Sequence, residues 1–225
     1  MSDPVATSFL DIVPATAEEG AYRYILHRIR MGIYLPGMRL LPEDIAADIH
    51  TSRMPVREAF RRLATEGLLT IRPNRGAVVR GLSAAEMREV FDMRAVLEGL
   101  AVTKALERIG SKELARLEGL IDSMESDKSN IPQWITAHRE FHEYLCRLSN
   151  SPRLVAQISS LHSIVEPHMR TWLELVSKPI SSRDEHMAIL ISIRMGDAAA
   201  VEATLRAHIR STVPALLRTM QDGNG

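Results

Sequence analysis

Two short runs of mainly β-branched and apolar residues flank a Pro-Asn-Arg-Gly sequence at residues 73–76 and give the only clear strand signal in the chain. Such runs on either side of a turn sequence predict a β-hairpin. Three segments with helical periodicity precede the hairpin, and they end near Pro36-Gly37, His50 and Gly67. Three helices followed by a hairpin within about 65 residues form the layout of a winged helix-turn-helix.

The chain from residue 83 onward shows helical patterns only, and we expect an all-helical bundle there. Turn-forming residues divide it into about six helices, which we place at 83–108, 111–125, 131–149, 151–177, 182–195 and 197–220. The predicted fold is therefore mainly α. It consists of a flexible N-terminal arm at 1–17, a winged helix-turn-helix domain at 18–80 and a helical domain at 83–221.

The net charge of zero conceals a basic segment. Residues 50–80 contain seven arginines and only two acidic residues, Glu58 and Glu66, of which Glu58 is expected to pair with Arg62. Arginine carries a planar fork of donors that suits phosphates and guanine edges. A protein with no net charge can therefore still present a basic face to nucleic acid.

On a helix that begins at Arg53, each interval of four residues rotates the side-chain direction by about 40° about the helix axis, so Arg53, Arg57 and Arg61 share one face. An apolar face adjoins them, formed by Val56, Ala59, Phe60 and Leu63. This division suits a recognition helix in a major groove, and Arg75 at the hairpin tip is placed to reach a phosphate or the minor groove. A solvated basic helix without function is the alternative.

The segment LPGMRLLPEDIAADIHTSRMPVREAFRRLATEGLLTIRPNRGAVV closely resembles the N-terminal domain of the GntR family of bacterial transcription regulators. The resemblance covers about residues 18–80 and rests on Pro-Gly before Arg-Leu, on SR-x-PVREA-x-x-RL-x-x-EGL and on RG-x-x-V. It implies that Arg53, Arg57 and the wing residue Arg75 contact operator DNA. This chain has Glu43 and Asp44 near a position where some relatives carry an arginine.

Four histidines occupy the apolar stripes of three predicted helices: His138 and His142, His186, and His208. One inward histidine is usually a hydrogen-bonded core residue. Four that converge lack enough hydrogen-bond acceptors for one another, unless a metal ion is their shared partner. The spacing of four residues between His138 and His142 also suits chelation by one helix.

Three segments of the second half, EVFDMRAVLEGLAV, HREFHEYLCRLSNSPRL and DEHMAILISIRMGDAAAVEATLRAHI, resemble the FCD effector-binding domain of the FadR branch of GntR regulators. The six predicted helices resemble its VanR subgroup. The resemblance implies a divalent metal held by His138, His142, His186 and His208. His138 stands where Asp is frequent, which favours zinc or nickel over manganese.

Arg94 shares the inward face of its predicted helix with Val90, Leu97 and Ala101. One interpretation is an ion pair with Glu98, one turn away. The family resemblance implies instead a place at the border of the effector pocket, where a guanidinium beside a metal suits a carboxylate ligand.

The sequence shows no run of the roughly 18 to 20 apolar residues that a membrane-spanning helix needs, and no apolar leader. The single cysteine, Cys146, agrees with a reducing compartment. We therefore expect a cytoplasmic protein that does not interact with membranes.

The leading hypothesis is a non-enzymatic, homodimeric transcription factor that binds a palindromic operator. We expect it to act as a repressor. A small organic acid is expected to bind through the metal and Arg94 and to change operator affinity. Two alternatives stay open: a metal-dependent hydrolase, because three histidines with an open position describe catalytic zinc, and a metal-free regulator that responds to an acyl thioester.

Overall fold

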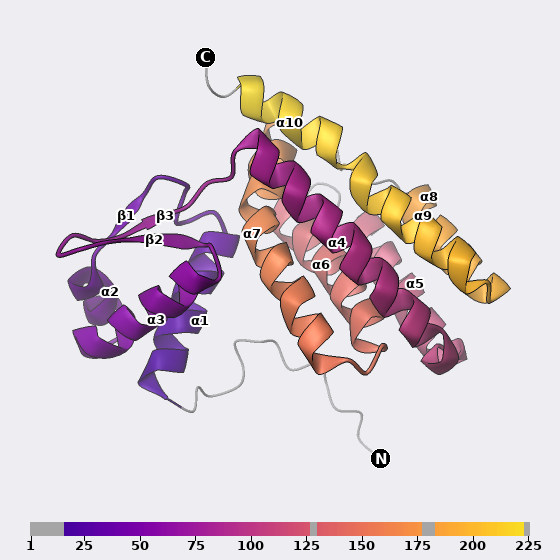
Figure 1. Cartoon of the computed structure of the whole chain (residues 1–225), viewed down its shortest axis with the longest axis horizontal. Coiled ribbons are helices and arrows are strands. Elements are labelled where there is room, and N and C mark those ends of the chain that lie inside the picture. The colour runs from indigo at the N-terminus through magenta and orange to yellow at the C-terminus, as the bar shows by residue number, and fades with distance from the viewer. Residues whose placement is uncertain (1–15, 127–129, 177–182, 223–225) are drawn as a thin grey trace. The chain divides into compact units, whose positions relative to one another are not determined.

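The computed structural model describes residues 16–126, 130–176 and 183–222, which form parts of two compact units, Met1–Gly81 and Leu82–Gly225 (Figure 1). The predicted N-terminal arm lies outside the described residues, except for Thr16 and Ala17. Here Thr16 caps the first helix, because its side chain accepts a hydrogen bond from the backbone N–H of Glu19.

The N-terminal unit contains three helices and a small antiparallel sheet (Figure 1). The elements are α1 (Ala17–Arg30), β1 (Arg39–Leu40), α2 (Pro42–Asp48), α3 (Arg53–Thr65), β2 (Leu69–Arg72) and β3 (Gly76–Val79). The three predicted helices and the hairpin are confirmed, but α1 ends at Arg30, before the predicted end near Pro36-Gly37. The strand β1 was not predicted, since two residues carry no periodic signal; it pairs with β3, so the strand order is β1-β3-β2.

Gly76 at the start of β3 explains why β1 can join the hairpin. Its φ of +81° lies in a region that other residues rarely adopt. A Cβ atom at this position would lie 2.1 Å from the carbonyl oxygen of Leu40 in β1. The absence of a side chain therefore allows both the turn and the close approach of the third strand.

The helix α3 packs against α1 through an apolar face and through Arg62, which contacts Glu19 and Tyr22 of α1. Val56, Phe60 and Leu63 are buried with Ile25 and Ile29 of α1. Such burial stabilises the unit by roughly 1.5 to 3 kcal/mol for each large side chain. The opposite, basic face of α3 is thereby left at the surface.

The second unit consists of packed helices, as predicted. They are α4 (Ala84–Ala105) with the short 3-10 helix η1 (Leu106–Arg108), α5 (Ser111–Ser126), α6 (Ile131–Arg147), α7 (Pro152–Val176), α8 (Arg183–Met195), α9 (Ala198–Ser211) and α10 (Val213–Asp222). The segment predicted as one helix at 197–220 is interrupted at Thr212. Pro214 explains the break, because its ring lacks an N–H and clashes with the preceding turn of a continuous helix.

The helix α4 begins with a capping box, in which Ser83 and Glu86 satisfy each other's backbone N–H groups. It packs beside α6, α7 and α9 (Figure 1). The contact with α9 is close at Gly99, where an added Cβ would lie 3.0 Å from Glu202 and 3.1 Å from Arg206. A glycine at this position therefore sets the spacing between α4 and α9.

The described helices include none that combines the length and the hydrophobicity of a membrane-crossing segment.

Candidate DNA interface and metal centre

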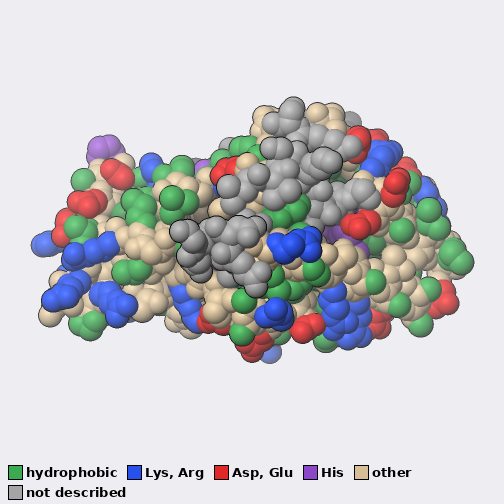
Figure 2. Space-filling view, turned by 90° about the horizontal axis from the view of Figure 1, so that it is seen from above, with side chains coloured by type: hydrophobic (Ala, Val, Ile, Leu, Met, Phe, Trp, Pro, Cys, Tyr) green, Lys and Arg blue, Asp and Glu red, His purple; other side chains and the backbone are tan. Residues whose placement is uncertain are grey.

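The arginines predicted to contact DNA lie around one groove of the N-terminal unit. Arg53, Arg57 and Arg61 extend from α3, and Arg75 extends from the turn between β2 and β3. All four line a groove of about 460 Å³. Figure 2 shows basic side chains gathered at the left end of the molecule, over this unit. The structure thus brings the predicted set together.

Two further arginines, Arg39 and Arg72, line the same groove and were not predicted as site residues. The Nε of Arg39 donates a hydrogen bond to the backbone carbonyl of Arg75, at 2.8 Å. This bond ties β1 to the tip of the wing. The role of Arg39 depends on its pairing with β3, which the sequence pattern alone does not reveal.

The predicted ion pair between Glu58 and Arg62 is wrong. Glu58 pairs with Arg61, at 2.5 Å, whereas Arg62 pairs with Glu19 of α1, at 2.8 Å, and stacks over the ring of Tyr22. The reason is that α1 packs beside Arg62 and offers it two acidic residues and an aromatic ring. Arg62 therefore belongs to the contact between α1 and α3, not to the groove.

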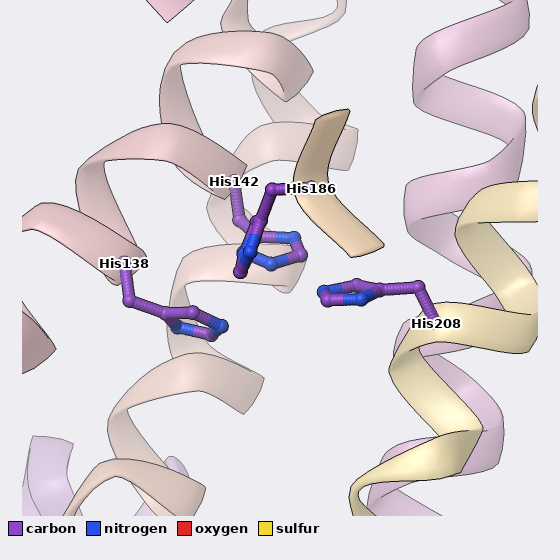
Figure 3. Close-up of side chains that lie close together, drawn as sticks. All are labelled: His138, His142, His186 and His208. Carbon is purple, nitrogen blue, oxygen red and sulfur yellow. The ribbon is translucent and has the colours of Figure 1, made fainter. Parts of the chain in front are cut away.

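The four histidines that the sequence singled out form one cluster inside the helical unit. His138 and His142 lie one turn apart on α6, His186 comes from α8 and His208 from α9, and their rings converge (Figure 3). All four are buried, and one possible ligand atom of each lies within 4.8 Å of those of the other three. Zinc bonds to imidazole nitrogen measure about 2.0 to 2.1 Å, so small shifts would let one ion contact all four rings.

Glu98 of α4 holds the ring of His142 in place. Its Oε2 accepts a hydrogen bond from Nδ1 of His142, at 2.9 Å. The other ring nitrogen, Nε2, is buried and has no hydrogen-bond partner among the described residues. A buried lone pair without a partner is costly in an apolar interior, and a metal ion would satisfy it.

Burial favours the neutral form of His138 and His142, the form that metal binding requires. Burial lowers the pKa of His142 from 6.5 to about 4, although Glu98 opposes this shift. Burial also holds the pKa of His138 well below its usual range, and the neighbouring histidines add to this effect. Neutral imidazole is the form that ligates metals.

Arg94 of α4 forms the ion pair with Glu98, and it also borders the cluster. Its side chain is only 2% exposed, and its Nε donates to Oε1 of Glu98, at 2.9 Å. Nη2 lies 3.3 Å from Nε2 of His162. Arg94 lines a cavity of about 10 Å³ together with His138, His142 and His208. This volume is close to that of a single water or metal ion.

Comparison with known proteins identifies both the N-terminal domain and the helical domain. Residues 17–79 match the model of the bacterial regulatory proteins of the gntR family, and residues 89–211, more than half of the chain, match the FCD domain. The Nta operon transcriptional regulator of Aminobacter aminovorans is 30% identical over 190 residues, which cover 84% of this chain and 89% of the relative. The chain belongs to the GntR family.

Other GntR relatives have similar lengths and folds. The transcriptional repressor RspR of Escherichia coli is 24% identical over 90% of both chains. Among solved structures, E. coli McbR/YncC matches with a TM-score of 0.80 and 23% identity over 92% of this chain and 99% of that one. A GntR regulator from Rhodococcus sp. RHA1 matches with a TM-score of 0.73 and 24% identity, over 89% of this chain and 97% of that one. This chain is therefore a DNA-binding transcriptional regulator of the GntR type with a C-terminal FCD domain.

Two residues of this regulator that lie against the histidine cluster were not predicted as site residues. They are His162 of α7 and Glu98 of α4, which was expected only as a partner for Arg94. Both are buried, and Nε2 of His162 lies 3.1 Å from Oε1 of Glu98. The position of Glu98 one turn after Arg94 was the available signal, but the contact with His142 depends on how α4 packs against α6.

Proposed function

We propose that the FCD domain of this regulator binds a divalent metal, with zinc or nickel favoured, through His138, His142, His186 and His208. The observation that carries the proposal is the buried Nε2 of His142, which lacks a hydrogen-bond partner among the described residues and lies in a cluster of four imidazoles. Nitrogen donors of this kind favour zinc, copper and nickel over manganese. When bound, the metal supplies a positive charge that attracts a carboxylate.

The effector in this proposal is a small organic acid whose carboxylate meets the metal and Arg94. The cavity of about 10 Å³ holds no such acid, so binding requires the cluster to open. We place this opening at the junction of α9 and α10, because the helix is interrupted at Thr212, and Ile209 and Thr212 line the cavity next to the start of α10. A ligand that prefers the open form shifts the population toward it.

The regulatory consequence is a change in operator affinity. We propose that two copies of the chain bind a palindromic operator through Arg53, Arg57, Arg61 and Arg75, and that the protein acts as a repressor. The shared groove around these four arginines supports this role. In this proposal effector binding weakens DNA binding, and linkage then requires DNA binding to weaken effector binding by the same factor.

The four converging histidines favour a sensory over a hydrolytic role for the metal. Catalytic zinc sites keep three protein ligands and hold a water in the fourth position, whereas four protein imidazoles occupy all four tetrahedral positions. The cluster of His138, His142, His186 and His208 supplies four. The carboxylate of the effector would then bind as an additional, fifth ligand.

Metal analysis of protein purified without a histidine tag tests the metal site. We expect about one equivalent of zinc or nickel per chain, and a fall in melting temperature when a chelator removes it. Less than about a tenth of an equivalent, with no uptake after addition, would contradict the proposal and favour the metal-free alternative. The variant His142→Gln should lose the metal, whereas His50→Gln, in the DNA-binding domain, should retain it.

A gel-shift titration with the upstream DNA of the protein's own gene tests the DNA face. We expect the double variant Arg53→Ala plus Arg57→Ala to lose at least about 30-fold in affinity, since each good base or phosphate contact contributes roughly 1 to 3 kcal/mol. Unchanged binding would contradict the assignment. Addition of organic acids, with and without metal, then identifies the effector class and the direction of regulation.

A further inference from the structure

The helical unit has a second cavity beside the junction of α9 and α10, which we call the outer cavity. It has a volume of about 470 Å³, and three arginines, one aspartate and three apolar residues of α4, α9 and α10 line it. Figure 1 shows α10 beside the start of α4, and the two helices are in contact. The outer cavity shares no lining residue with the histidine cavity. Its volume lies within the range of roughly 300 to 1,000 Å³ that small-molecule sites occupy.

The charged residues of the outer cavity carry an excess of positive charge. Arg88 and Asp92 come from α4, Arg210 comes from α9, and Arg218 comes from α10. The Nε of Arg210 donates a hydrogen bond to Oδ1 of Asp92, at 2.9 Å, and this pair joins α9 to α4. Three guanidinium groups against one carboxylate leave a local charge of plus two.

Arg88 and Arg218 have no carboxylate partner among the described residues. The Nη1 of Arg88 donates to the backbone carbonyl of Ala84, at 3.3 Å, which leaves its charge unbalanced. By contrast, Arg147 and Arg206 on the surface of the same unit each pair with a glutamate. The outer cavity therefore offers two guanidinium groups whose charge an anionic ligand can balance.

An apolar wall adjoins these arginines, formed by Val213, Pro214 and Leu217 of α10. Val213 and Leu217 are half-buried against the core of the unit, and Pro214 is exposed. Pro214 and Arg218 lie one turn apart, so α10 presents apolar surface and a guanidinium group on the same side. A molecule in the outer cavity thus meets hydrocarbon and positive charge together.

We propose that the outer cavity is a second ligand site of this regulator, which binds a small phosphate monoester with an apolar body, and that the bound phosphate bridges α4 and α10. A phosphate monoester carries a charge of about −1.5 to −2 at pH 7, which matches the local charge of plus two. Its three oxygens accept hydrogen bonds from several guanidinium groups at once. A carboxylate has a single charge and would balance only one of Arg88 and Arg218.

The bound phosphate also acts on the junction of α9 and α10. Ile209 and Thr212 at this junction line the histidine cavity, whereas Arg210 between them lines the outer cavity. A ligand that holds Arg218 of α10 to Arg88 of α4 keeps α10 on the domain and disfavours the opening of the histidine cavity. This step rests on the proposed opening at the junction, but phosphate binding itself does not.

Isothermal titration of the full chain, without metal, DNA or effector, tests the ligand class with three probes. Phenyl phosphate should bind at least about fivefold more tightly than inorganic phosphate, because its ring is buried against the apolar wall. It should also bind at least about fivefold more tightly than benzoate, which carries one charge. No binding of phenyl phosphate up to about 10 mM, or equal affinity for either of the other probes, would overturn the proposal.

Removal of single arginines tests the location of the site. Arg88→Ala and Arg218→Ala should each weaken binding of phenyl phosphate at least about fivefold, because each removes a charge-assisted hydrogen bond. The matched control is Arg108→Ala. Arg108 is exposed and donates to the carbonyl of Lys104, as Arg88 does to that of Ala84, but it does not line the outer cavity. An equal effect of Arg108→Ala and Arg88→Ala would overturn the location.

Asp92→Asn tests the electrostatic basis in the opposite direction. The substitution removes the negative charge of the outer cavity and releases Arg210 from its ion pair. We expect phenyl phosphate to bind at least about threefold more tightly to this variant. Weaker binding would show that the pair of Asp92 and Arg210 shapes the site and would contradict recognition by charge.

Hydrogen exchange tests the effect on the junction. Saturating phenyl phosphate should slow amide exchange of residues 209–217 at least about fivefold, because the ligand binds only the state in which α10 contacts α4. The amides of α1 in the DNA-binding domain are the control and should change less than about twofold. Binding of phenyl phosphate with unchanged exchange at the junction would overturn the bridge between α4 and α10.

The outcomes separate the outer cavity from the metal and DNA proposals. Arg88→Ala and Arg218→Ala should change operator affinity less than about threefold, because neither residue lines the arginine groove. A loss of at least about tenfold, without binding of phenyl phosphate, would assign both arginines to DNA phosphates and overturn the proposal. Absence of phenyl phosphate binding with intact metal content overturns the outer cavity alone. Loss of metal by His142→Gln with unchanged binding of phenyl phosphate supports two separate sites.

Discussion

The carboxylate of Glu98 accepts a hydrogen bond from Nδ1 of His142, at 2.9 Å, across the contact between α4 and α6. This bond fixes the tautomer of His142 and leaves its Nε2 unprotonated inside the histidine cluster. Arg94 and His162 in turn hold Glu98, since its two oxygens contact all three side chains. Burial alone would raise the pKa of Glu98, but Arg94 and then the two histidines keep it well below the usual range.

We expect Glu98→Gln to weaken metal binding by roughly 10- to 100-fold, which is the usual effect of removing a charged partner from a metal-ligating histidine. A competition titration against a chromophoric chelator measures this. The control is Glu202→Gln, which removes an exposed partner of Arg206 in the same domain. Equal affinities of Glu98→Gln and the wild type would show that Glu98 does not act on the metal site.

The substitution His138→Asp should change which metal the site prefers. A carboxylate oxygen in place of this imidazole favours manganese, and we expect the preference for nickel over manganese to fall at least about tenfold. Isothermal titration with each metal measures the ratio. His168→Gln should not change the preference, because His168 lies outside the cluster and accepts a hydrogen bond from the backbone N–H of Leu82. An unchanged ratio in His138→Asp would remove His138 from the ligand set.

The metal-free protein should lose stability as the pH falls from about 7 to 4. The folded-state pKa of His142 is about 4, below its ordinary value of 6.5, so between these values the unfolded chain binds a proton that the folded chain does not. Stability then decreases toward acid, by up to about 3 kcal/mol for His142, and His138 acts in the same direction. Urea unfolding across this range, with chelator present, measures the slope. A flat profile between pH 7 and 5 would contradict the burial of neutral histidines.

Gly76→Ala should destabilise the DNA-binding domain by roughly 2 to 4 kcal/mol, because the new methyl group meets the carbonyl of Leu40 and the backbone has a positive φ. Gly37→Ala is the matched control. Gly37 also has a positive φ but has open space around it, so a cost of about 1 kcal/mol is expected. Thermal unfolding followed by circular dichroism compares them. Equal losses of unfolding free energy in the two variants would mean that the contact between β1 and β3 does not determine the destabilisation by Gly76→Ala.

Two arginines on α3 should behave differently. Arg57→Ala should weaken operator binding at least about tenfold and make the affinity less dependent on salt. Arg62→Ala should lower the melting temperature of the DNA-binding domain, since Arg62 contacts Glu19 and Tyr22 of α1. Its operator affinity, measured below that temperature, should change less than about threefold. The reverse pattern would exchange the two roles.

The sequence alone determined the elements of this GntR regulator and the residue types of its sites. The helical periods, the turn residues and the spacing of the arginines on α3 are local properties, so three helices, the hairpin and the shared basic face followed from them. The inward histidines were likewise readable from their helix stripes.

Only the tertiary structure decided which side chains meet. Glu98 accepts a hydrogen bond from His142, and Arg62 pairs with Glu19 and not with the predicted Glu58. Both contacts form because packing between helices brings residues far apart in the chain within hydrogen-bond distance. The sequence pattern also did not predict the strand β1 or the interruption of the last helix at Thr212. A two-residue strand forms only when β3 offers it partners, and Pro214 divides a segment whose apolar period continues across it.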